Sequence, residues 1–379
     1  MTRFSFRNGG IITPEGALSG ATIEVSNGRI ADIAPLSADA DIVIDLDGGW
    51  LVPGFIDVQV NGGDGVLFND APTVEGMAAI ARAHARFGTT ALLPTLISDG
   101  SDVIARALDA LDAAMAAGVP GVVGAHIEGP VFNEKRHGIH DPARVRRFDP
   151  ELIELLARPR AGVRLVTLAP EKVERDQIAR LINSGILLSI GHSDADYETA
   201  RSAIDAGVTG ITHLYNAMSP LHHRAPGIVG AALEDDRVYC GLIADGFHVH
   251  DAALRVALRA RPRDRMMLVT DAMPCVGGDG SGSFDLQGRT IHVEAGRCFG
   301  DDGTLAGSAL DMASAFRNAV TRLHVTPEHA VALSATNPAA FLGLSHERGA
   351  LACGLVADWV QLDAYFRHVD TWIGGNRFS

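Results

Sequence analysis

The chain has 379 residues, a formal net charge of −14 and an apolar fraction of 47% with only 6% aromatic residues. This length suits one large barrel with a small satellite, and the apolar fraction is sufficient for a full core. The acidic balance without an evident basic patch argues against nucleic-acid binding, and no apolar run approaches the roughly 20 residues of a membrane span.

The first residues and the cysteines bear on the cellular compartment. Met1 to Ser5 lack a charged start followed by an apolar segment, so no secretory signal is visible. The four cysteines lie far apart without a CxxC pair, which is typical of reduced thiols and not of a disulfide framework. We therefore expect a cytoplasmic protein, in which an anionic substrate would need local cations.

Residues 1–52 are expected to form short strands joined by turns. Asn27-Gly28 lies between segments of apolar alternation, which is a strong hairpin signal. The segment 354–362 has the same character. We expect residues 1–52 and 345–379 to form the two parts of one small β-sandwich.

Residues 53–344 alternate between apolar strand candidates and amphipathic helical stretches. The strand candidates are 55–60, 90–96, 122–127, 163–169, 186–192, 210–214, 239–245 and 266–271, and the clearest helices are 73–87, 101–117, 172–183 and 252–259. Gly118 follows the second helix at the position of a C-cap. This alternation predicts an α/β fold of the (β/α)8 TIM-barrel type. A doubly wound sheet remains an alternative, although no GxGxxG follows a strand.

The segment 275–307 interrupts the alternation after strand eight. It is rich in turn pairs, including Gly277-Gly278-Asp279-Gly280 and Asp302-Gly303. We expect a β-hairpin excursion over the mouth of the barrel. Ser308 is expected to open a helical run at 309–323, and Thr326 and Asn337 are expected to begin two further helices.

Polar residues mark the carboxyl ends of several predicted strands, which is where such barrels carry their chemistry. Two neighbouring strands end in His192 and His213, the third carries Glu128, and the eighth ends in Asp271. One carboxylate and two imidazoles suit a catalytic divalent metal with a fourth position open for water. A charged residue at the end of an apolar strand also requires a partner or a cation.

Each of these residues has a plainer interpretation. A lone histidine at a strand end is most often a solvated or capping residue, Glu128 could anchor a loop, and Asp271 could belong to a turn. The joint occurrence on four strands favours the metal site. His126 lies inside strand three, and because side chains alternate along a strand we interpret it as a structural core histidine.

Together these motifs resemble the amidohydrolase superfamily and, within it, the N-acetylglucosamine-6-phosphate deacetylases. The matching segments, in the family's order, are Pro53–Asp57, His126–Pro130, Gly191–Ser193, Thr212–Met218, Ile243–His248, Thr270–Ala272 and Leu305–Ser308. His-x-Glu-Gly-Pro combined with His-Leu-Tyr-Asn-Ala-Met is specific to these deacetylases, whereas a strand ending in Thr-Asp is not. The resemblance implies hydrolysis of N-acetylglucosamine 6-phosphate to glucosamine 6-phosphate and acetate, in amino-sugar catabolism or cell-wall recycling.

The resemblance also implies a role for each matching position. Glu128, His192 and His213 would bind the metal, Asp271 would be the general acid and base, and His140 would polarise the amide carbonyl. Substrate contacts are implied for Gln59, Ile139, Asn216, Ala217, Arg224, His248, Leu305, Ala306 and Gly307. Arg224 would reach the phosphate bound by the neighbouring subunit, which implies a homodimer.

Gln59-Val60-Asn61 departs from the wider superfamily, where His-x-His at this place binds a second metal. Amides are poor ligands for such ions, so we expect one divalent metal per subunit. Zinc is expected first, while iron, cobalt and manganese also accept this ligand set. Three alternatives stay open: a deacetylase of N-acetylgalactosamine 6-phosphate, another amidohydrolase that opens a cyclic amide or deaminates a base, and a metal-free barrel acting as an assembly subunit.

Overall fold

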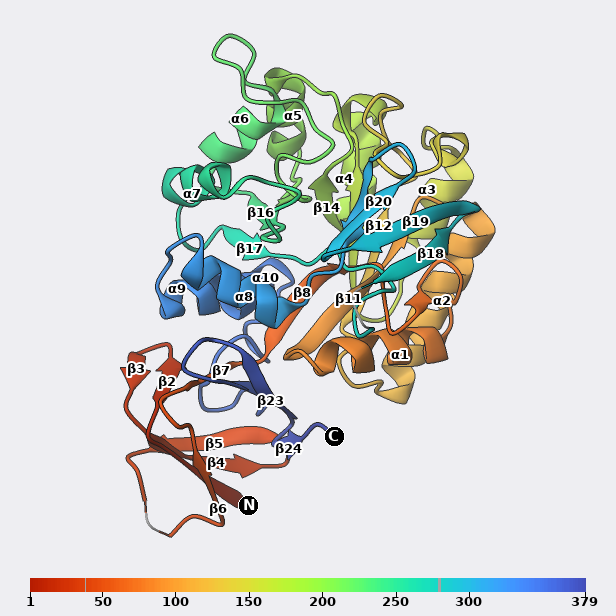
Figure 1. Ribbon diagram of the computed structural model, residues 1–379. Coiled ribbons are helices and arrows are strands. Elements are labelled where there is room, and N and C mark those ends of the chain that lie inside the picture. Colours follow the sequence, from red (N-terminus) through yellow and green to blue (C-terminus); the bar gives the residue numbers. More distant parts are fainter. Residues whose placement is uncertain (38, 279–280) are drawn as a thin grey trace.

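Eight parallel strands form the centre of the computed structural model, which describes residues 1–37, 39–278 and 281–379. They follow one another in the order β17-β16-β15-β14-β13-β12-β11-β8 and curl into a nearly closed barrel (Figure 1). Their bounds are β8 (Phe55–Val60), β11 (Thr89–Ile97), β12 (Gly124–Glu128), β13 (Val163–Leu168), β14 (Leu187–Ile190), β15 (Gly210–Ile211), β16 (Tyr239–Leu242) and β17 (Met266–Leu268). All eight predicted strands are present, and the predicted (β/α)8 barrel is confirmed.

The barrel closes at its mouth through the residues that follow β17. The backbone N–H of Asp271 donates to the carbonyl of Gln59 at 3.0 Å, and that of Asn61 donates to the carbonyl of Ala272 at 2.8 Å. The hydroxyl of Thr270 donates to the buried carboxylate of Asp57 at 2.5 Å. These bonds join the last strand to the first and place Asp271 beside Gln59 and Asn61.

Helices cover the outside of the barrel (Figure 1). Their bounds are α1 (Val74–Ala85), α2 (Ser101–Ala117), η1 (Pro142–Arg144), α3 (Pro150–Ala157), η2 (Pro170–Lys172), α4 (Arg175–Asn183), α5 (Tyr197–Asp205), α6 (Gly227–Glu234), α7 (Asp251–Ala260), α8 (Met312–Thr321), α9 (Pro327–Val331), η3 (Ala332–Thr336) and α10 (Asn337–Phe341). Helix α2 has its predicted bounds, and Gly118 ends it with a φ of 62°, the left-handed conformation that glycine adopts without strain.

Two helices begin later than the sequence predicted. Ser308 ends strand β21 (Leu305–Ser308), where its N–H donates to the carbonyl of Asp271, and α8 begins at Met312 after the N-cap Asp311. Helix α4 begins at Arg175 because Glu174 and Gln177 form a capping box. Asn337 begins α10 as predicted, and the π-helical turn η3 joins α9 to α10 without a break.

Two further sheets form the small β-unit at the bottom of Figure 1. The first has the order β5-β4-β1-β6 and the second the order β24-β23-β22-β7-β2-β3, with bounds β1 (Thr2–Arg7), β2 (Gly10–Thr13), β3 (Gly16–Leu18), β4 (Ala21–Ser26), β5 (Arg29–Ala34), β6 (Ile42–Asp45), β7 (Trp50–Pro53), β22 (Trp359–Leu362), β23 (His368–Ile373) and β24 (Asn376–Arg377). Antiparallel pairing of β7 with β22 joins the two chain ends. The predicted union of the terminal segments is therefore confirmed, while the domain boundaries at 52/53 and 344/345 stay predictions.

An aromatic cluster fills the core of this unit. The ring of Phe4 lies edge-on to Trp359 and to Trp372, each at a centroid distance of 5.3 Å. Such contacts add to the free energy gained by burying the rings.

Among the described residues, no helix of the protein combines the length and apolar character needed to cross a bilayer.

A separate antiparallel sheet of hairpins lies over the mouth of the barrel (Figure 1). It consists of β18 (Gly282–Leu286), β19 (Arg289–Glu294), β20 (Arg297–Gly300) and β21, and a two-strand ribbon of β9 (Gly62–Gly63) and β10 (Val66–Leu67) lies after β8. Leu286 and Ile291 of the hairpin sheet share a buried cluster with Ile97 at the end of β11. The hairpin prediction holds for the described residues; Asp279 and Gly280 lie outside them.

Candidate active site

A cavity of about 240 Å³ opens at the carboxyl ends of the barrel strands, beneath the hairpin sheet. Its lining includes most of the residues singled out from the sequence: Glu128, Ile139, His140, His192, His213, Asn216, Ala217, His248, Asp271, Leu305 and Gly307. The topology brings them together because parallel strands deliver their carboxyl ends to one rim.

The strands end earlier than predicted because the residues after them turn sharply. His192, His213 and Asp271 have φ values of 50°, 33° and 52°. Non-glycine residues rarely adopt this left-handed region, and such strain concentrates at functional sites. The turn rotates each side chain out of the pleat and into the cavity.

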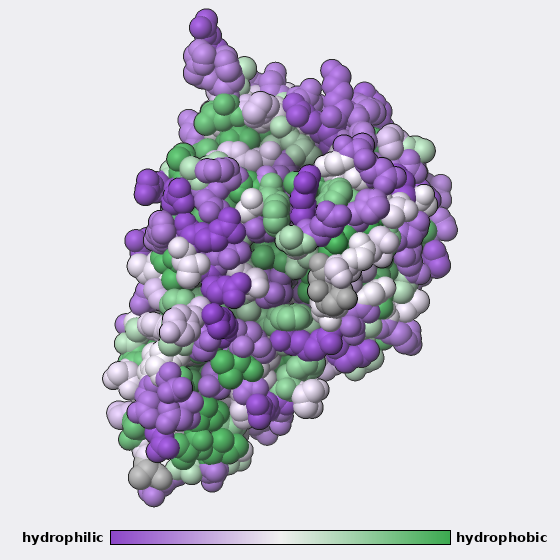
Figure 2. All heavy atoms as spheres, in the orientation of Figure 1, coloured by the Kyte–Doolittle hydropathy of each residue, from purple (hydrophilic) through white to green (hydrophobic). Residues whose placement is uncertain are grey.

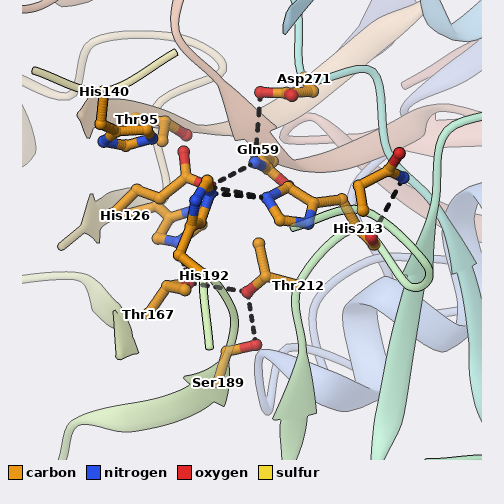
Figure 3. Close-up of polar contacts among 12 residues, drawn as sticks. Gln59, Thr95, His126, His140, Thr167, Ser189, His192, Thr212, His213 and Asp271 are labelled. Atoms are coloured by element: carbon orange, nitrogen blue, oxygen red, sulfur yellow. Dashed lines mark hydrogen bonds and ion pairs between the residues drawn. The ribbon is translucent and has the colours of Figure 1, made fainter. Parts of the chain in front are cut away.

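Three ligand atoms converge on one point of the cavity (Figure 3). Oε1 of Glu128 lies 3.3 Å from Nε2 of His192 and 3.2 Å from Nε2 of His213, and the two Nε2 atoms are 3.0 Å apart. A tetrahedral ion with bonds of about 2.0 Å has ligand–ligand edges of about 3.3 Å. The three atoms therefore have the spacing that such an ion requires.

Hydrogen bonding supports a cation at this point. Nδ1 of His192 lies 2.9 Å from the carbonyl of Arg136, which can only accept, so Nδ1 carries the proton and Nε2 presents a lone pair. That lone pair faces the carboxylate oxygen of Glu128, another acceptor. A divalent cation would turn this repulsion into coordination, and the carbonyl of Arg136 would orient the imidazole from behind.

His140, Glu128 and His192 form a second possible group of metal ligands. Their ligand atoms all lie within 4.8 Å of one another. Nδ1 of His140, however, accepts a hydrogen bond from the backbone N–H of Ser98 at 3.2 Å. Nε2 must therefore carry the proton in the neutral ring. Burial, followed by the charge of His192, holds the pKa of His140 well below its usual range, so the ring is a neutral N–H donor facing the cavity.

Asp271 is held by two amides. Its Oδ1 accepts from Nδ2 of Asn61 at 2.7 Å. It also accepts from Nε2 of Gln59 at 3.2 Å (Figure 3). Burial, followed by the charge of Glu128, raises the pKa of Asp271 to about 6. A carboxylate with this pKa accepts a proton near neutral pH and can also return it.

Gln59 lies beneath the cavity and does not line it. Its Nε2 donates to Glu128 at 3.0 Å as well as to Asp271, and the side chain is 1% exposed. Gln59 thus holds the two carboxylates in a fixed relative position. His126 lies in the same buried layer, where burial lowers its pKa to about 4 and its ring bonds Thr167 and the carbonyl of Val58.

Most of the other predicted substrate contacts line the cavity, and one of them is buried away from it. His248 is oriented by a 2.6 Å hydrogen bond from Nδ1 to the carboxylate of Asp245, which leaves Nε2 toward the cavity. Asn216 and Ala217 line the cavity wall after β15. Ile139 also lines the cavity, and its carbonyl accepts a hydrogen bond from Arg289 of the hairpin sheet. Ala306, by contrast, is fully buried in the apolar cluster of the hairpin sheet.

Arg224 does not reach the cavity of its own chain. It is exposed in the segment 219–226, which projects as a hydrophilic knob at the top of Figures 1 and 2, and its Nε donates to the ring of His223 at 3.0 Å. Among the described residues that line the cavity there is no arginine or lysine.

Several lining or supporting residues were not identified from the sequence. Asn61 was noted only as part of the place where His-x-His is missing, yet it is the nearest partner of Asp271. Phe132 stacks on His192 at a centroid distance of 4.3 Å. Met273, Leu286 and Thr304 complete the lining, together with Ile97 and Gly138. Only the position of Asn61, two residues after Gln59 and directly after the end of β8, could have signalled such a role.

Comparisons with known proteins agree with this geometry. A family model described as "Amidohydrolase family" matches residues 50–377. An N-acetylgalactosamine-6-phosphate deacetylase of Shewanella sp. (strain ANA-3) is 44% identical over 370 residues, covering 96% of this chain and 93% of its own. An N-acetylglucosamine-6-phosphate deacetylase of Bos taurus is 38% identical over 379 residues, covering 95% and 92%.

Solved structures show the same similarity in three dimensions. An N-acetylglucosamine-6-phosphate deacetylase from Pasteurella multocida superposes with a TM-score of 0.94 at 32% identity, covering 99% of both chains. A Mycobacterium smegmatis deacetylase in complex with N-acetyl-D-glucosamine-6-phosphate has a TM-score of 0.91 at 32% identity, covering 100% of this chain and 99% of its own. With its family match, its full-length relatives and its strand-end site, this chain belongs to the amidohydrolase family.

Proposed function

We propose that the protein hydrolyses the N-acetyl group of an N-acetylhexosamine 6-phosphate, with N-acetylglucosamine 6-phosphate as the first substrate. The convergence of Glu128, His192 and His213 beside Asp271 in one cavity carries the proposal. The deacetylase relatives and structural neighbours, which cover nearly the whole chain, support the substrate class. The product would be the free amino-sugar phosphate with acetate.

The metal ligands we propose are Glu128, His192 and His213. Mutual distances of 3.0–3.3 Å favour His213 over His140 as the third ligand. The protonated Nε2 of His140 has no lone pair to offer, and its Nδ1 already accepts from Ser98. Gln59 and Asn61 supply amides where a second metal would need imidazoles, so we propose one ion per subunit, zinc first.

A divalent cation held by Glu128, His192 and His213 would supply Lewis-acid polarisation and make an attacking water more acidic. Asp271 removes a proton from the attacking water, with Oδ1 anchored by Asn61 and Gln59. Nε2–H of His140 donates to the carbonyl oxygen of the acetamide as negative charge develops there. Asp271 then returns the proton to the departing nitrogen, because an amine leaves only when protonated.

The phosphate is proposed to bind at the outer rim, where Asn216, Ala217 and His248 face the cavity. No arginine or lysine of the same chain lines this cavity among the described residues, so a dianion would lack a guanidinium or ammonium partner there. We propose that Arg224 of the neighbouring subunit in a homodimer supplies it, since guanidinium binds phosphate in a bidentate manner. Leu305 and Gly307 would close over the sugar, with Ala306 backing them and Gln59 fixing the carboxylates.

N-acetylgalactosamine 6-phosphate is a second candidate substrate. The relative from Shewanella that carries this name is 44% identical, compared with 38% for the deacetylase of Bos taurus. The two sugars differ only in the orientation of one hydroxyl, which one or two hydrogen bonds can distinguish.

Acetate release from both sugar phosphates, with the metal quantified on the same sample, tests the proposal. We expect turnover of at least one epimer that depends on bound metal and is lost on chelation. Turnover of neither epimer, in a sample that carries metal, would contradict the proposed function. The ratio of the two kcat/KM values decides between the substrates.

We also propose that the enzyme is cytoplasmic, because all four cysteines are free thiols.

A further inference from the structure

A second cavity, of about 390 Å³, lies on the flank of the barrel between the end of α7 and the segment from α8 to α9, which are near each other in Figure 1. It shares no lining residue with the cavity described above. Basic residues dominate its lining: Arg255, Arg259, Arg261, Arg263, His324 and His329. The four arginines among them place positive charge on one flank of a chain whose net charge is −14.

Two of these arginines have structural partners. The buried Arg261 donates to the carbonyl of Val238 at 2.6 Å and pairs with Asp236 at 3.2 Å. Arg255 donates to the carbonyl of Arg322 at 3.0 Å, at the C-cap of α8. Both side chains therefore have fixed positions in the wall of the cavity.

The other two arginines, Arg259 and Arg263, are exposed at the cavity. Within the described chain, Arg259 and Arg263 form no ion pair, and no acidic residue lines the cavity. The nearby Asp264 is already paired with Arg265 at 2.7 Å. Like charges gathered without a counter-charge repel one another, so an anion in the cavity would stabilise them.

Unpartnered buried nitrogen atoms also point to a ligand. Nε2 of His329 has no hydrogen-bond partner among the described residues although the side chain is only 9% exposed, and Nε of Arg261 lacks one as well. Buried polar atoms nearly always have a partner in protein, water or ligand. Leu258, Leu323 and Val325 add an apolar surface to the same lining.

We propose that this cavity binds a phosphorylated small molecule. Arg259, Arg263 and His329 would meet the phosphate, for which guanidinium groups are suited, and the apolar residues would pack against the organic part. The volume lies within the range of about 300–1,000 Å³ that is typical of small-molecule sites. Because none of these residues belongs to the proposed catalytic machinery, the inference does not depend on the proposed function.

Calorimetric titration of the metal-loaded protein with inorganic phosphate and with adenosine 5′-monophosphate, at constant ionic strength, tests the proposal. The double variant Arg259→Ala/Arg263→Ala is compared with Arg106→Ala/Arg158→Ala. The control removes the same charge from two exposed arginines on and near α2 and α3 that form no ion pair with described residues. Both variants should fold and release acetate at the wild-type rate, since all four side chains contact solvent.

We expect the dissociation constant of both probes to rise at least about tenfold in the cavity variant and to stay unchanged in the control. Binding that is equal in the two variants, or absent from the wild-type protein, would overturn the proposal. Adenosine monophosphate should bind more tightly than phosphate because of the apolar surface. If it binds no better, the assignment to an organic phosphate is wrong.

Discussion

The floor and the rim of the active-site cavity are built differently. Floor residues Glu128, His192, His213 and Asp271 lie at the ends of barrel strands and are at most 9% exposed. The amide of Gln59 holds Glu128 and Asp271, and the carbonyl of Arg136 holds His192. The rim is formed by loops and hairpins, including Leu286, Thr304 and Leu305, and carries no arginine or lysine among its described residues.

This difference indicates which part of the reaction each region controls. A rigid floor with every group in place suits bond breaking, because pre-positioned groups need no reorganisation during the reaction. Without an arginine or lysine among its described residues, the rim lacks a fixed positive charge for a phosphorylated substrate, which the proposed Arg224 of a neighbouring subunit would supply. Substitutions in the floor should therefore lower kcat, whereas substitutions that affect the rim should raise KM.

The largest effect is expected from loss of a metal ligand. His213→Ala should lose the metal and reduce turnover by about 10³-fold or more, since metal polarisation contributes several kcal/mol to transition-state stabilisation. His140→Ala should retain the metal while turnover falls. Metal per subunit, measured by mass spectrometry of the purified variants, checks both. If His140→Ala loses the metal and His213→Ala keeps it, the third ligand is His140.

Asp271→Asn should follow in size. The amide cannot accept the proton, so kcat should fall by about 10²–10⁴-fold while bound metal stays unchanged. Replacement of the exposed Asp302 by asparagine provides the control. A kcat for Asp271→Asn within a few-fold of wild type would remove Asp271 from the role of general base.

Arg224→Ala tests the rim. Loss of a charge-assisted contact to phosphate should raise KM for the phosphorylated sugar by about 10–100-fold and leave kcat nearly unchanged. The unphosphorylated sugar should show no such rise. Equal effects on both sugars would exclude a phosphate contact.

Mixed dimers sharpen this test. When Arg224→Ala and Asp271→Asn chains are co-assembled, the second chain supplies Arg224 to the intact floor of the first. We expect each heterodimer to regain wild-type KM at one of its two sites. No recovery in a verified heterodimer would show that Arg224 acts within its own chain or not at all.

The smallest effect concerns the pH dependence of the floor. Burial raises the pKa of Asp271 to about 6, while the hydrogen bond from Asn61 lowers it. The base is active only when deprotonated, so kcat/KM should fall as pH falls through about 6. Asn61→Leu removes the lowering contact and should shift this acid limb upward by up to about one pH unit. An unchanged limb would mean that another group limits activity at low pH.

The barrel and the identity of the floor residues could be predicted from the sequence because both depend on local patterns. Apolar runs separated by amphipathic helices define eight strands, and topology then places their last residues on one rim. Asn61 was missed since nothing in its own segment shows that Asp271, 210 residues later, bonds it. Ser308 was assigned to the start of a helix because nothing in its own segment shows that it pairs with Asp271, 37 residues earlier in the chain.

The sequence by itself determined the parallel barrel, the pairing of the chain ends and the set of side chains at the strand ends, because hydrophobic periodicity and residue type are local properties. Only the tertiary structure decided how these side chains act. The left-handed turns at His192, His213 and Asp271, the proton on Nδ1 of His192 and on Nε2 of His140, and the raised pKa of Asp271 all arise from neighbours distant in the chain. Burial and hydrogen bonding set these properties, and both exist only once the chain has folded.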